Sequence, residues 1–234
     1  MKQNLARLRT QIRQAARDCG RDPEEITLLA VSKGQPAGAI QAATEAGQRH
    51  FGESYVQEAI AKITVLNDPG LTWHFIGPIQ ANKCRDIARH FHWVHSLDRM
   101  KVAQRLAHSL PEGYPPLNVC IQVNISGEKT KSGVAPARTL ELAQAVRELP
   151  SLRLRGLMAI PAPSADPADQ RQSYRAMRDL FIELCSRGFV LDTLSLGMSN
   201  DYEVAIENGS NLVRIGTAIF GPRLRNGDSA AKRD

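Results

Sequence analysis

The feature that most constrains the fold is a repeated alternation of short apolar segments with longer amphipathic segments along the chain of 234 residues. The short segments are rich in residues that favour strands, and the segments that follow them carry apolar residues at helical spacing. The predicted strand and helix pairs are 26–32 with 37–46, 50–52 with 54–65, 72–76 with 82–90, 93–95 with 100–110, 118–123 with 137–149, 153–160 with 169–185, 193–196 with 199–208, and 212–215 with 218–220. This order predicts an α/β protein with a parallel sheet.

Eight such units without a Gly/Ser linker favour a single (β/α)8 TIM barrel. A doubly wound sheet is the alternative, but it normally has a Gly-x-Gly-x-x-Gly turn after its first strand, and residues 33–36 do not match one. Apolar residues at helical spacing predict an extra N-terminal helix at about 4–19. We expect one domain over 1–234, with the barrel at about 26–223.

Two further segments are predicted to lie outside regular structure. The run 161–167 is rich in proline and alanine, which is typical of a mobile loop at a barrel mouth. Residues 224–234 are expected to form a short polar tail.

Composition narrows the protein class. The four cysteines are widely separated and contain no Cys-x-x-Cys pair, which argues against a disulfide framework, an iron–sulfur cluster and a zinc ribbon. The N-terminus has no apolar signal region and no stretch is long enough to span a membrane, so we expect a cytoplasmic protein. The net charge of +6 leaves nucleic-acid binding as an alternative, although lysine and arginine are scattered and a smaller anionic ligand would use the same field.

Lys33 is the first candidate functional residue. It follows the apolar run 28–31, and no acidic residue lies closer in sequence than Glu25 and Glu45. Desolvation lowers the pKa of a lysine, and the neutral amine is the form that condenses with a carbonyl. The alternative is a lysine at the end of a strand that reaches into solvent.

The last two strands end in residues suited to phosphate. Function in a (β/α)8 barrel lies where the strands end, and phosphate typically binds at the loops after strands seven and eight. Ser199, predicted at a helix N-cap, and Gly216 with Thr217 offer hydroxyls and close backbone approach. Alternatively, Ser199 only caps a helix and Gly216 only permits a turn.

A lysine at the same barrel mouth as a phosphate site formed by Ser199, Gly216 and Thr217 suits pyridoxal 5′-phosphate (PLP), because PLP carries an aldehyde and a phosphate on one ring. Arg214, at the end of the last predicted strand, could donate to the ring nitrogen. An arginine there weakens the electron sink that many PLP enzymes create with an acid.

Ordered motifs between residues 5 and 223 closely resemble the YggS/PROSC family of pyridoxal phosphate homeostasis proteins. The motifs are residues 29–33 (LAVSK), 51–58 (FGESYVQE), 73–77 (WHFIG), 131–133 (KSG), 156–158 (GLM) and 214–221 (RIGTAIFG). The resemblance implies a barrel like the N-terminal domain of bacterial alanine racemase, with PLP held as a Schiff base and a role in vitamin B6 and amino acid homeostasis. By position, it implies that the following residues bind the cofactor: Lys33 through the aldimine, Arg214 at the ring nitrogen, Ser199, Gly216 and Thr217 at the phosphate, and Ser54, His74 and Met158 nearby.

The sequence departs from the family pattern at three positions, one of which is a residue named above. Ser54 stands where most members have asparagine, Ala81 replaces a common serine, and Gln35 stands where some members have a second lysine. If that second lysine helps to hand PLP on, Lys131 could replace it, although a solvated loop lysine is the simpler interpretation.

The resemblance favours a PLP carrier without catalysis over an enzyme. Racemisation of the alanine racemase type needs a second base, which that family supplies as a tyrosine from a C-terminal domain of the partner subunit, and none of the tyrosines here can be assigned that role. We expect a monomer that buffers PLP and contacts apo-PLP enzymes transiently. A PLP-dependent racemase or lyase is one alternative, and a metal site formed by His90, His92 and His95 is another, although these side chains should diverge.

Overall fold

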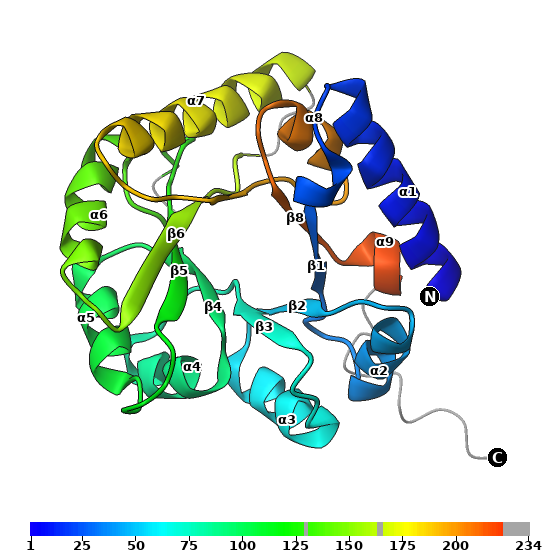
Figure 1. The fold of residues 1–234 in the computed structure, drawn as a ribbon, viewed down its shortest axis with the longest axis horizontal. Helices are drawn as coiled ribbons and strands as arrows, with labels where there is room; N and C mark the ends of the chain where they lie inside the picture. The colour runs from blue at the N-terminus through cyan, green and yellow to red at the C-terminus, as the bar shows by residue number, and fades with distance from the viewer. Residues whose placement is uncertain (129–130, 163–165, 222–234) are drawn as a thin grey trace.

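The computed structural model describes residues 1–128, 131–162 and 166–221, and its eight parallel strands close into a barrel in the order β1 to β8 (Figure 1). β1 pairs with both β2 and β8, which completes the ring. The strands are β1 (Thr27–Val31), β2 (His50–Glu53), β3 (Thr72–Phe75), β4 (Trp93–Leu97), β5 (Leu117–Gln122), β6 (Leu152–Met158), β7 (Thr193–Ser195) and β8 (Leu212–Ile215). The predicted (β/α)8 barrel is therefore confirmed.

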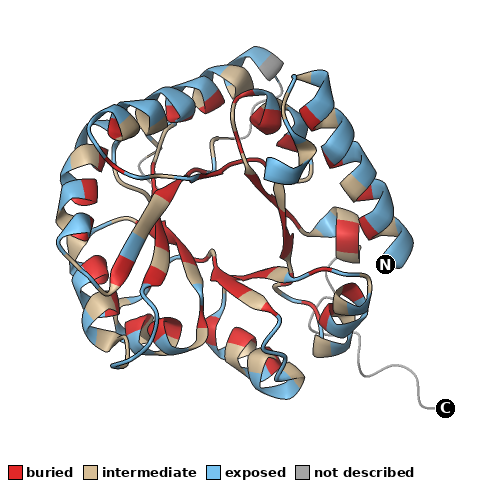
Figure 2. Cartoon of the chain, in the orientation of Figure 1, coloured by how far each residue is buried: buried red, intermediate tan, exposed pale blue. Residues whose placement is uncertain are grey.

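Helices surround the barrel and turn their apolar faces toward it, so that buried residues face inward and exposed residues face solvent (Figure 2). They are α1 (Lys2–Asp18), α2 (Ala37–Glu45), α3 (Val56–Leu66), α4 (Cys84–His90), α5 (Met100–Ser109), α6 (Thr139–Arg147), α7 (Pro167–Ser186), α8 (Tyr202–Glu207) and α9 (Thr217–Phe220). Three short 3-10 helices are η1 (Pro23–Glu25), η2 (Ala81–Lys83) and η3 (Pro136–Arg138).

The predicted N-terminal helix is confirmed as α1. It buries Leu5, Leu8, Ile12 and Ala16, which recur at helical spacing on one face. This face packs against α8 and α9, beside the last strand. α1 therefore covers the side of the barrel where the chain closes the sheet.

The loop after β7 differs from its prediction, because Ser199 is not a helix N-cap. α8 begins at Tyr202 with Asp201 as its N-cap. Asp201 Oδ1 accepts a hydrogen bond of 2.6 Å from the N–H of Met198, and Gly197 has φ of 87°, so the chain turns here before the helix starts. The expected polar tail 224–234, the barrel end at 223 and residues 163–165 of the expected loop lie outside the described residues.

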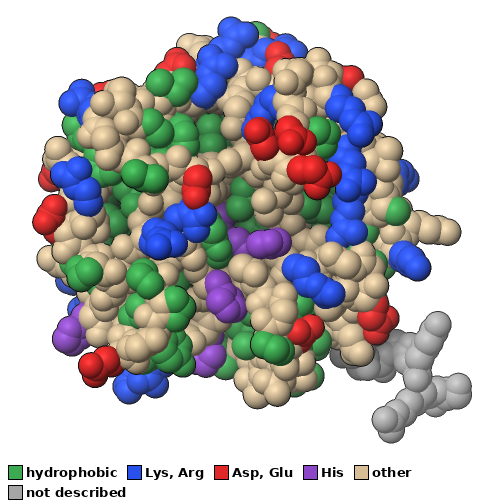
Figure 3. All heavy atoms as spheres, in the orientation of Figure 1, with side chains coloured by type: hydrophobic (Ala, Val, Ile, Leu, Met, Phe, Trp, Pro, Cys, Tyr) green, Lys and Arg blue, Asp and Glu red, His purple; other side chains and the backbone are tan. Residues whose placement is uncertain are grey.

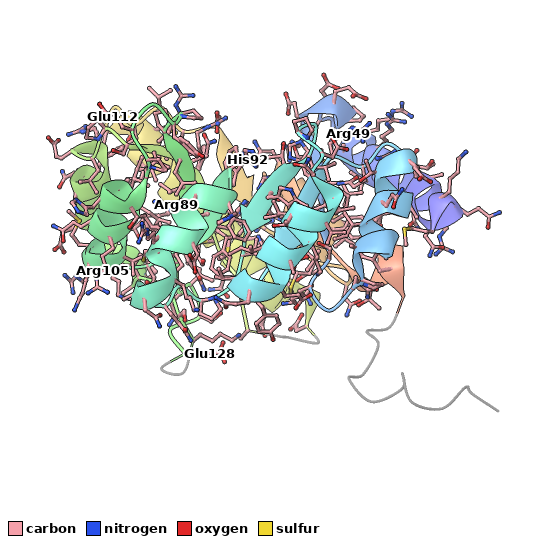
Figure 4. The ribbon with its side chains drawn as sticks, turned by 90° about the horizontal axis from the view of Figure 1, so that it is seen from below. Arg49, Arg89, His92, Arg105, Glu112 and Glu128 are labelled. Carbon is pink, nitrogen blue, oxygen red and sulfur yellow. The ribbon has the colours of Figure 1, made fainter. Side chains whose placement is uncertain are left out.

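The two mouths of the barrel can be distinguished in Figure 4. Arg49, His92 and Glu112, which precede strands β2, β4 and β5, lie at the mouth where strands begin, and Glu128, which follows β5, lies at the opposite mouth. Among the described residues, no helix combines the length and the apolar character needed to cross a bilayer.

Candidate functional site

A cavity of about 170 Å³ lies at the mouth where the strands end, which is where a barrel of this type carries its function. Its lining comes from the segments after β1, β3, β6 and β7 and from β8 and α9: Val31, Lys33, Gln35, Ile76, Ile160, Met198, Ser199, Arg214, Gly216, Thr217 and Gly221. Five of the residues predicted from the sequence are thus brought to one cavity: Lys33, Ser199, Arg214, Gly216 and Thr217.

Hydrogen bonds fix the backbone on both sides of Lys33. The hydroxyl of Ser32 donates to Glu53 Oε1 at 2.6 Å, and the N–H of Gly34 donates to Glu58 Oε1 at 2.6 Å. Hydrogen bonds to charged acceptors are the stronger class. The short segment after β1 is therefore anchored to β2 and α3, and Lys33 starts from a fixed backbone at the cavity wall.

A buried lysine joins the two carboxylates. Lys62 Nζ on α3 lies 2.7 Å from Glu53 Oε1 and 2.5 Å from Glu58 Oε1, and only 7% of its side chain is exposed. Burial raises the pKa of Glu53, and the neighbouring Lys62 partly opposes this rise. Glu53 Oε2 is buried without a hydrogen-bond partner among the described residues.

The sequence analysis missed this cluster. Glu53 and Glu58 stand inside the 51–58 motif, and Lys62 follows Glu58 at the four-residue spacing at which helical side chains pair. That spacing is also usual for a solvated ion pair, so it did not indicate burial beside Lys33.

Arg214 is held at the base of the cavity by three oxygen atoms. Its Nη1 donates to the carbonyl oxygen of Ser195 at 2.5 Å and to Ser195 Oγ at 2.7 Å, and its Nη2 donates to the carbonyl oxygen of Ala159 at 2.8 Å. The side chain is buried, which lowers its pKa, while Tyr174 and Asp201 oppose the shift. An arginine keeps its charge in a protein, so the cavity has a fixed cation and donor on one wall.

Side chains outside the cavity hold the loop that carries Ser199. Tyr174 OH donates to Asp201 Oδ2 at 2.6 Å, and the other oxygen of Asp201 accepts from the N–H of Met198. Burial, followed by the hydrogen bond to Asp201, raises the pKa of Tyr174. Tyr174 is therefore a neutral donor that orders residues 198–201, and the sequence alone assigned it no role.

Gly216 lets β1 and β8 approach closely at the other side of the cavity. A Cβ atom at this position would lie 3.0 Å from the carbonyl oxygen of Val31. The next residue, Thr217, supplies a hydroxyl to the lining. The amine of Lys33 is of the kind that bonds an aldehyde, the hydroxyls of Ser199 and Thr217 with the backbone at Gly216 are of the kind that bind a phosphate, and the guanidinium of Arg214 can donate to a ring nitrogen, so the residues present fit PLP.

The remaining predicted cofactor residues do not belong to the described lining of this cavity. Ser54 follows β2, and Met158 is the last residue of β6 and is fully buried. His74 lies in the barrel interior, where Nε2 is 3.0 Å from His50 Nδ1 and Nδ1 is 2.9 Å from His95 Nε2. Direct cofactor contact by these three residues stays a prediction.

The structure also shows where Gln35 and Lys131 lie, the two residues discussed in connection with the family's second lysine. Gln35 is buried and lines the cavity near Lys33, so the family's second lysine position belongs to the site. Lys131 forms an ion pair with Glu128 and donates to the carbonyl oxygen of Pro161 at 3.4 Å.

The three histidines considered as metal ligands point to different partners. His90 Nδ1 lies 2.8 Å from the carbonyl oxygen of Asp86, His92 Nδ1 accepts from the N–H of Trp73, and His95 is inside the barrel. Among the described residues, no group of three or more His, Cys, Asp or Glu side chains is arranged to hold a metal ion.

Comparisons with known proteins show the family to which this protein belongs. Residues 3–223 match the family described as "Alanine racemase, N-terminal domain". A Pseudomonas aeruginosa protein named "Pyridoxal phosphate homeostasis protein" is 56% identical over 221 residues, which cover 94% of this chain and 95% of that protein. The Escherichia coli K12 protein of the same name is 57% identical over 223 residues, with 94% and 95% coverage.

The fold also matches a solved structure with PLP. PipY of Synechococcus elongatus, solved with PLP bound, has a TM-score of 0.83 and 37% identity, and the match covers 94% of this chain and 99% of PipY. The structure of PipY without PLP has a TM-score of 0.86 at the same identity. The same barrel fold therefore occurs in a relative that was solved with PLP bound.

Proposed function

The chain belongs to the YggS/PROSC family of pyridoxal phosphate homeostasis proteins, and from this premise we propose that it binds PLP in the cavity described above. The observation that carries the proposal is that Lys33 lines the same cavity of about 170 Å³ as Ser199, Gly216 and Thr217. An amine and a set of groups suited to phosphate in one cavity are what a small phosphorylated aldehyde requires.

Each cavity residue has a distinct part in this proposal. Lys33 holds the aldehyde as a Schiff base, while Ser199, Gly216 and Thr217 hold the phosphate. Arg214 donates to the ring nitrogen, and its fixed positive charge keeps that nitrogen unprotonated. When bound, PLP supplies an electrophilic carbonyl, and an unprotonated ring makes it a weaker electron sink.

We propose that the protein is a carrier or buffer of PLP in the cytoplasm and does not catalyse a reaction of its own. The names of the relatives describe homeostasis, and Arg214 takes the place of the acid that would strengthen the electron sink. We further propose that it acts as a monomer within one domain and contacts apo-PLP enzymes transiently. The role lies in vitamin B6 and amino acid homeostasis.

The visible absorption spectrum of the purified protein, before and after borohydride reduction, tests the proposed bond. We expect a Schiff-base band that reduction fixes onto Lys33, as located by peptide mapping. Lys33→Ala should lack the band, while Lys101→Ala, which removes an exposed lysine of α5, should retain it. No band after incubation with excess PLP would refute the proposal.

A second experiment distinguishes transfer of PLP to an apo-enzyme from catalytic turnover of amino acids. Loaded protein is mixed with an apo-PLP enzyme, and the rate of reactivation is compared with that given by the same concentration of free PLP. A carrier should reactivate the enzyme faster than free PLP and should leave free amino acids unchanged. Turnover of amino acids under PLP saturation would support the racemase or lyase alternative instead.

A further inference from the structure

A chain of hydrogen-bonded side chains crosses the barrel interior and ends at Arg214. His50 Nδ1 lies 3.0 Å from His74 Nε2, and His74 Nδ1 lies 2.9 Å from His95 Nε2. His95 Nδ1 lies 3.0 Å from Ser195 Oγ, which accepts a hydrogen bond of 2.7 Å from Arg214. We call these five residues, from β2, β3, β4, β7 and β8, the histidine chain.

The arginine end gives the histidine chain a direction. Arg214 can only donate, so Ser195 Oγ must be the acceptor of that bond. A hydroxyl can accept and donate at once, so in the direction proposed here the hydrogen of Ser195 is directed at its other partner among the described residues, His95 Nδ1. An imidazole that accepts at Nδ1 while neutral carries its hydrogen on Nε2.

The same rule applies at each following ring. In the proposed direction, His95 Nε2–H donates across the 2.9 Å contact to His74 Nδ1, and His74 Nε2–H donates across the 3.0 Å contact to His50 Nδ1. His50 is left with its hydrogen on Nε2. Every hydrogen bond therefore runs from the PLP side of the barrel toward the opposite mouth.

This direction requires neutral imidazoles, and the surroundings keep them neutral. Burial and the charge of Arg214 lower the pKa of His95 to about 3. Burial, followed by the neighbouring His95, His50 and His92, lowers the pKa of His74 well below its usual value. Burial and then His92 lower the pKa of His50.

The charged groups nearest the outer side of the histidine chain are an ion pair stacked on Trp93. Trp93 stacks on His74 with ring centroids 5.4 Å apart, and the Arg155 guanidinium lies 4.6 Å from the centre of the Trp93 ring. Arg155 is itself paired with Asp192, whose Oδ2 lies 2.5 Å from Nη2, so burial and the neighbouring histidines remain the causes of the lowered pKa of His74.

The far end of the histidine chain reaches solvent at the mouth where strands begin. His50 is partly exposed and lines a cavity of about 310 Å³ whose charged lining is Arg9, Arg13, Arg49 and Glu24. Figure 3, which shows this face, has histidine side chains near its centre with both basic and acidic side chains around them. The direction of the hydrogen bonds in the histidine chain can therefore be altered by a substitution at His50, which is not a residue of the proposed PLP cavity.

We propose that His74 and His95 are positioning residues that act through Ser195 to set the orientation of Arg214. With Ser195 Oγ held as an acceptor, this oxygen and the carbonyl oxygens of Ser195 and Ala159 fix the plane of the guanidinium. If the hydrogen bonds of the histidine chain ran in the opposite direction, His95 Nδ1–H would also donate to Ser195 Oγ. The hydroxyl hydrogen of Ser195 would then have to point to another acceptor. The effect on bound PLP rests on the proposed function, whereas the direction of the chain does not.

The direction is tested in the PLP-free protein by nitrogen NMR of isotope-labelled histidines. We expect His74 and His95 to be neutral and to carry hydrogen on Nε2 between about pH 6 and pH 8. A hydrogen on Nδ1 of His95, or an imidazolium at either residue, would overturn the proposal. This experiment uses the wild-type chain, so it does not depend on whether a variant folds.

A matched pair at His50 tests the link to Arg214. His50→Gln keeps an oxygen that can accept from His74 Nε2–H, whereas His50→Leu removes the acceptor at similar size. We expect the leucine variant to produce mixed tautomers at His74 and His95 and to shift the Nε–H resonance of Arg214. The glutamine variant should restore the wild-type signals, and His108→Leu, at an exposed position on α5, should leave them unchanged.

The last experiment repeats the comparison with PLP bound. His50→Leu should shift the absorption maximum of bound PLP and weaken its binding several-fold, while His50→Gln and His108→Leu match the wild type. Identical spectra, affinities and Arg214 resonances in the leucine and glutamine variants would overturn the positioning role. If the wild type binds no PLP, the proposed function fails, while the NMR experiments still decide the direction of the chain.

Discussion

The ammonium group of Lys62 donates a hydrogen bond of 2.8 Å to the carbonyl oxygen of Ser32, the residue immediately before Lys33. Two lysines therefore lie in adjacent parts of the structure with different surroundings. Lys62 is buried between the carboxylates of Glu53 and Glu58, whereas Lys33 lines the cavity. The first lysine is suited to holding the backbone and the second to reacting with a carbonyl.

Removing Lys62 should destabilise the fold. Lys62→Met leaves the buried Glu53 carboxyl without its ion-pair partner, and breaking a buried pair in this way costs about 3–5 kcal/mol. Chemical denaturation measures the free energy of unfolding. The matched change Lys101→Met at an exposed position should alter it by less than about 0.5 kcal/mol. Equal stability of the two variants would show that the Lys62 cluster contributes little.

The fold was predictable because it depends on periodicity that local sequence carries. The alternation of apolar strands with amphipathic helices predicted the barrel, and Leu5, Leu8 and Ile12 predicted α1. That Lys33 and the loops after β7 and β8 line one cavity was also predictable, because the ends of parallel strands must meet at one mouth.

The parts that were missed depend on contacts between distant strands. His95 on β4 and Ser195 on β7 are 100 positions apart, and no local pattern marks their hydrogen bond. The N-cap assignment of Ser199 failed because the helix starts later, with Asp201 at the N-cap position and its carboxylate bonded to the N–H of Met198 and to Tyr174 OH. Both residue types cap helices well, and the turn at Gly197 decides between them.

Gly156 should tolerate no side chain, because β6 and β7 approach closely there. A Cβ atom would lie 1.7 Å from the carbonyl oxygen of Thr193, so Gly156→Ala must separate the strands and should cost about 3 kcal/mol. Gly38→Ala on α2 meets no atom within 4 Å and should raise stability by about 0.5–1 kcal/mol. Thermal or urea unfolding of both variants gives the comparison. A stable Gly156→Ala variant would contradict the close packing of β6 and β7.

Tyr174→Phe should weaken PLP binding without changing Lys33. The change removes the hydrogen bond that holds Asp201 and hence the loop with Ser199, which is worth about 1 kcal/mol, or about a fivefold loss of affinity. Tyr202→Phe removes a hydroxyl that bonds to Glu203 and serves as the matched control. Titration of PLP by absorption measures both. Equal affinity in the two variants would show that the phosphate loop is ordered without Tyr174.

The buried histidines should make the PLP-free protein less stable as the pH falls. Folded His95 accepts a proton only near its lowered pKa of about 3, whereas unfolded His95 accepts one near 6.5. Between these values the unfolded state binds more protons, so each such histidine lowers the free energy of unfolding by about 1.4 kcal/mol per pH unit. The pKa of His74 is also lowered, so its contribution has the same sign.

Glu53 opposes this trend, and a variant separates the two contributions. Its pKa is raised in the folded state, so above 4.5 the folded state holds the extra proton and gains stability as the pH falls. Two fully buried histidines outweigh one carboxyl, and stability should therefore fall from about pH 6 to pH 5. In Glu53→Gln the opposing contribution is gone, so the fall should be steeper when unfolding is measured at each pH. A flat profile in both proteins would mean that His74 and His95 take up protons in the folded state, and the neutral histidine chain would be wrong.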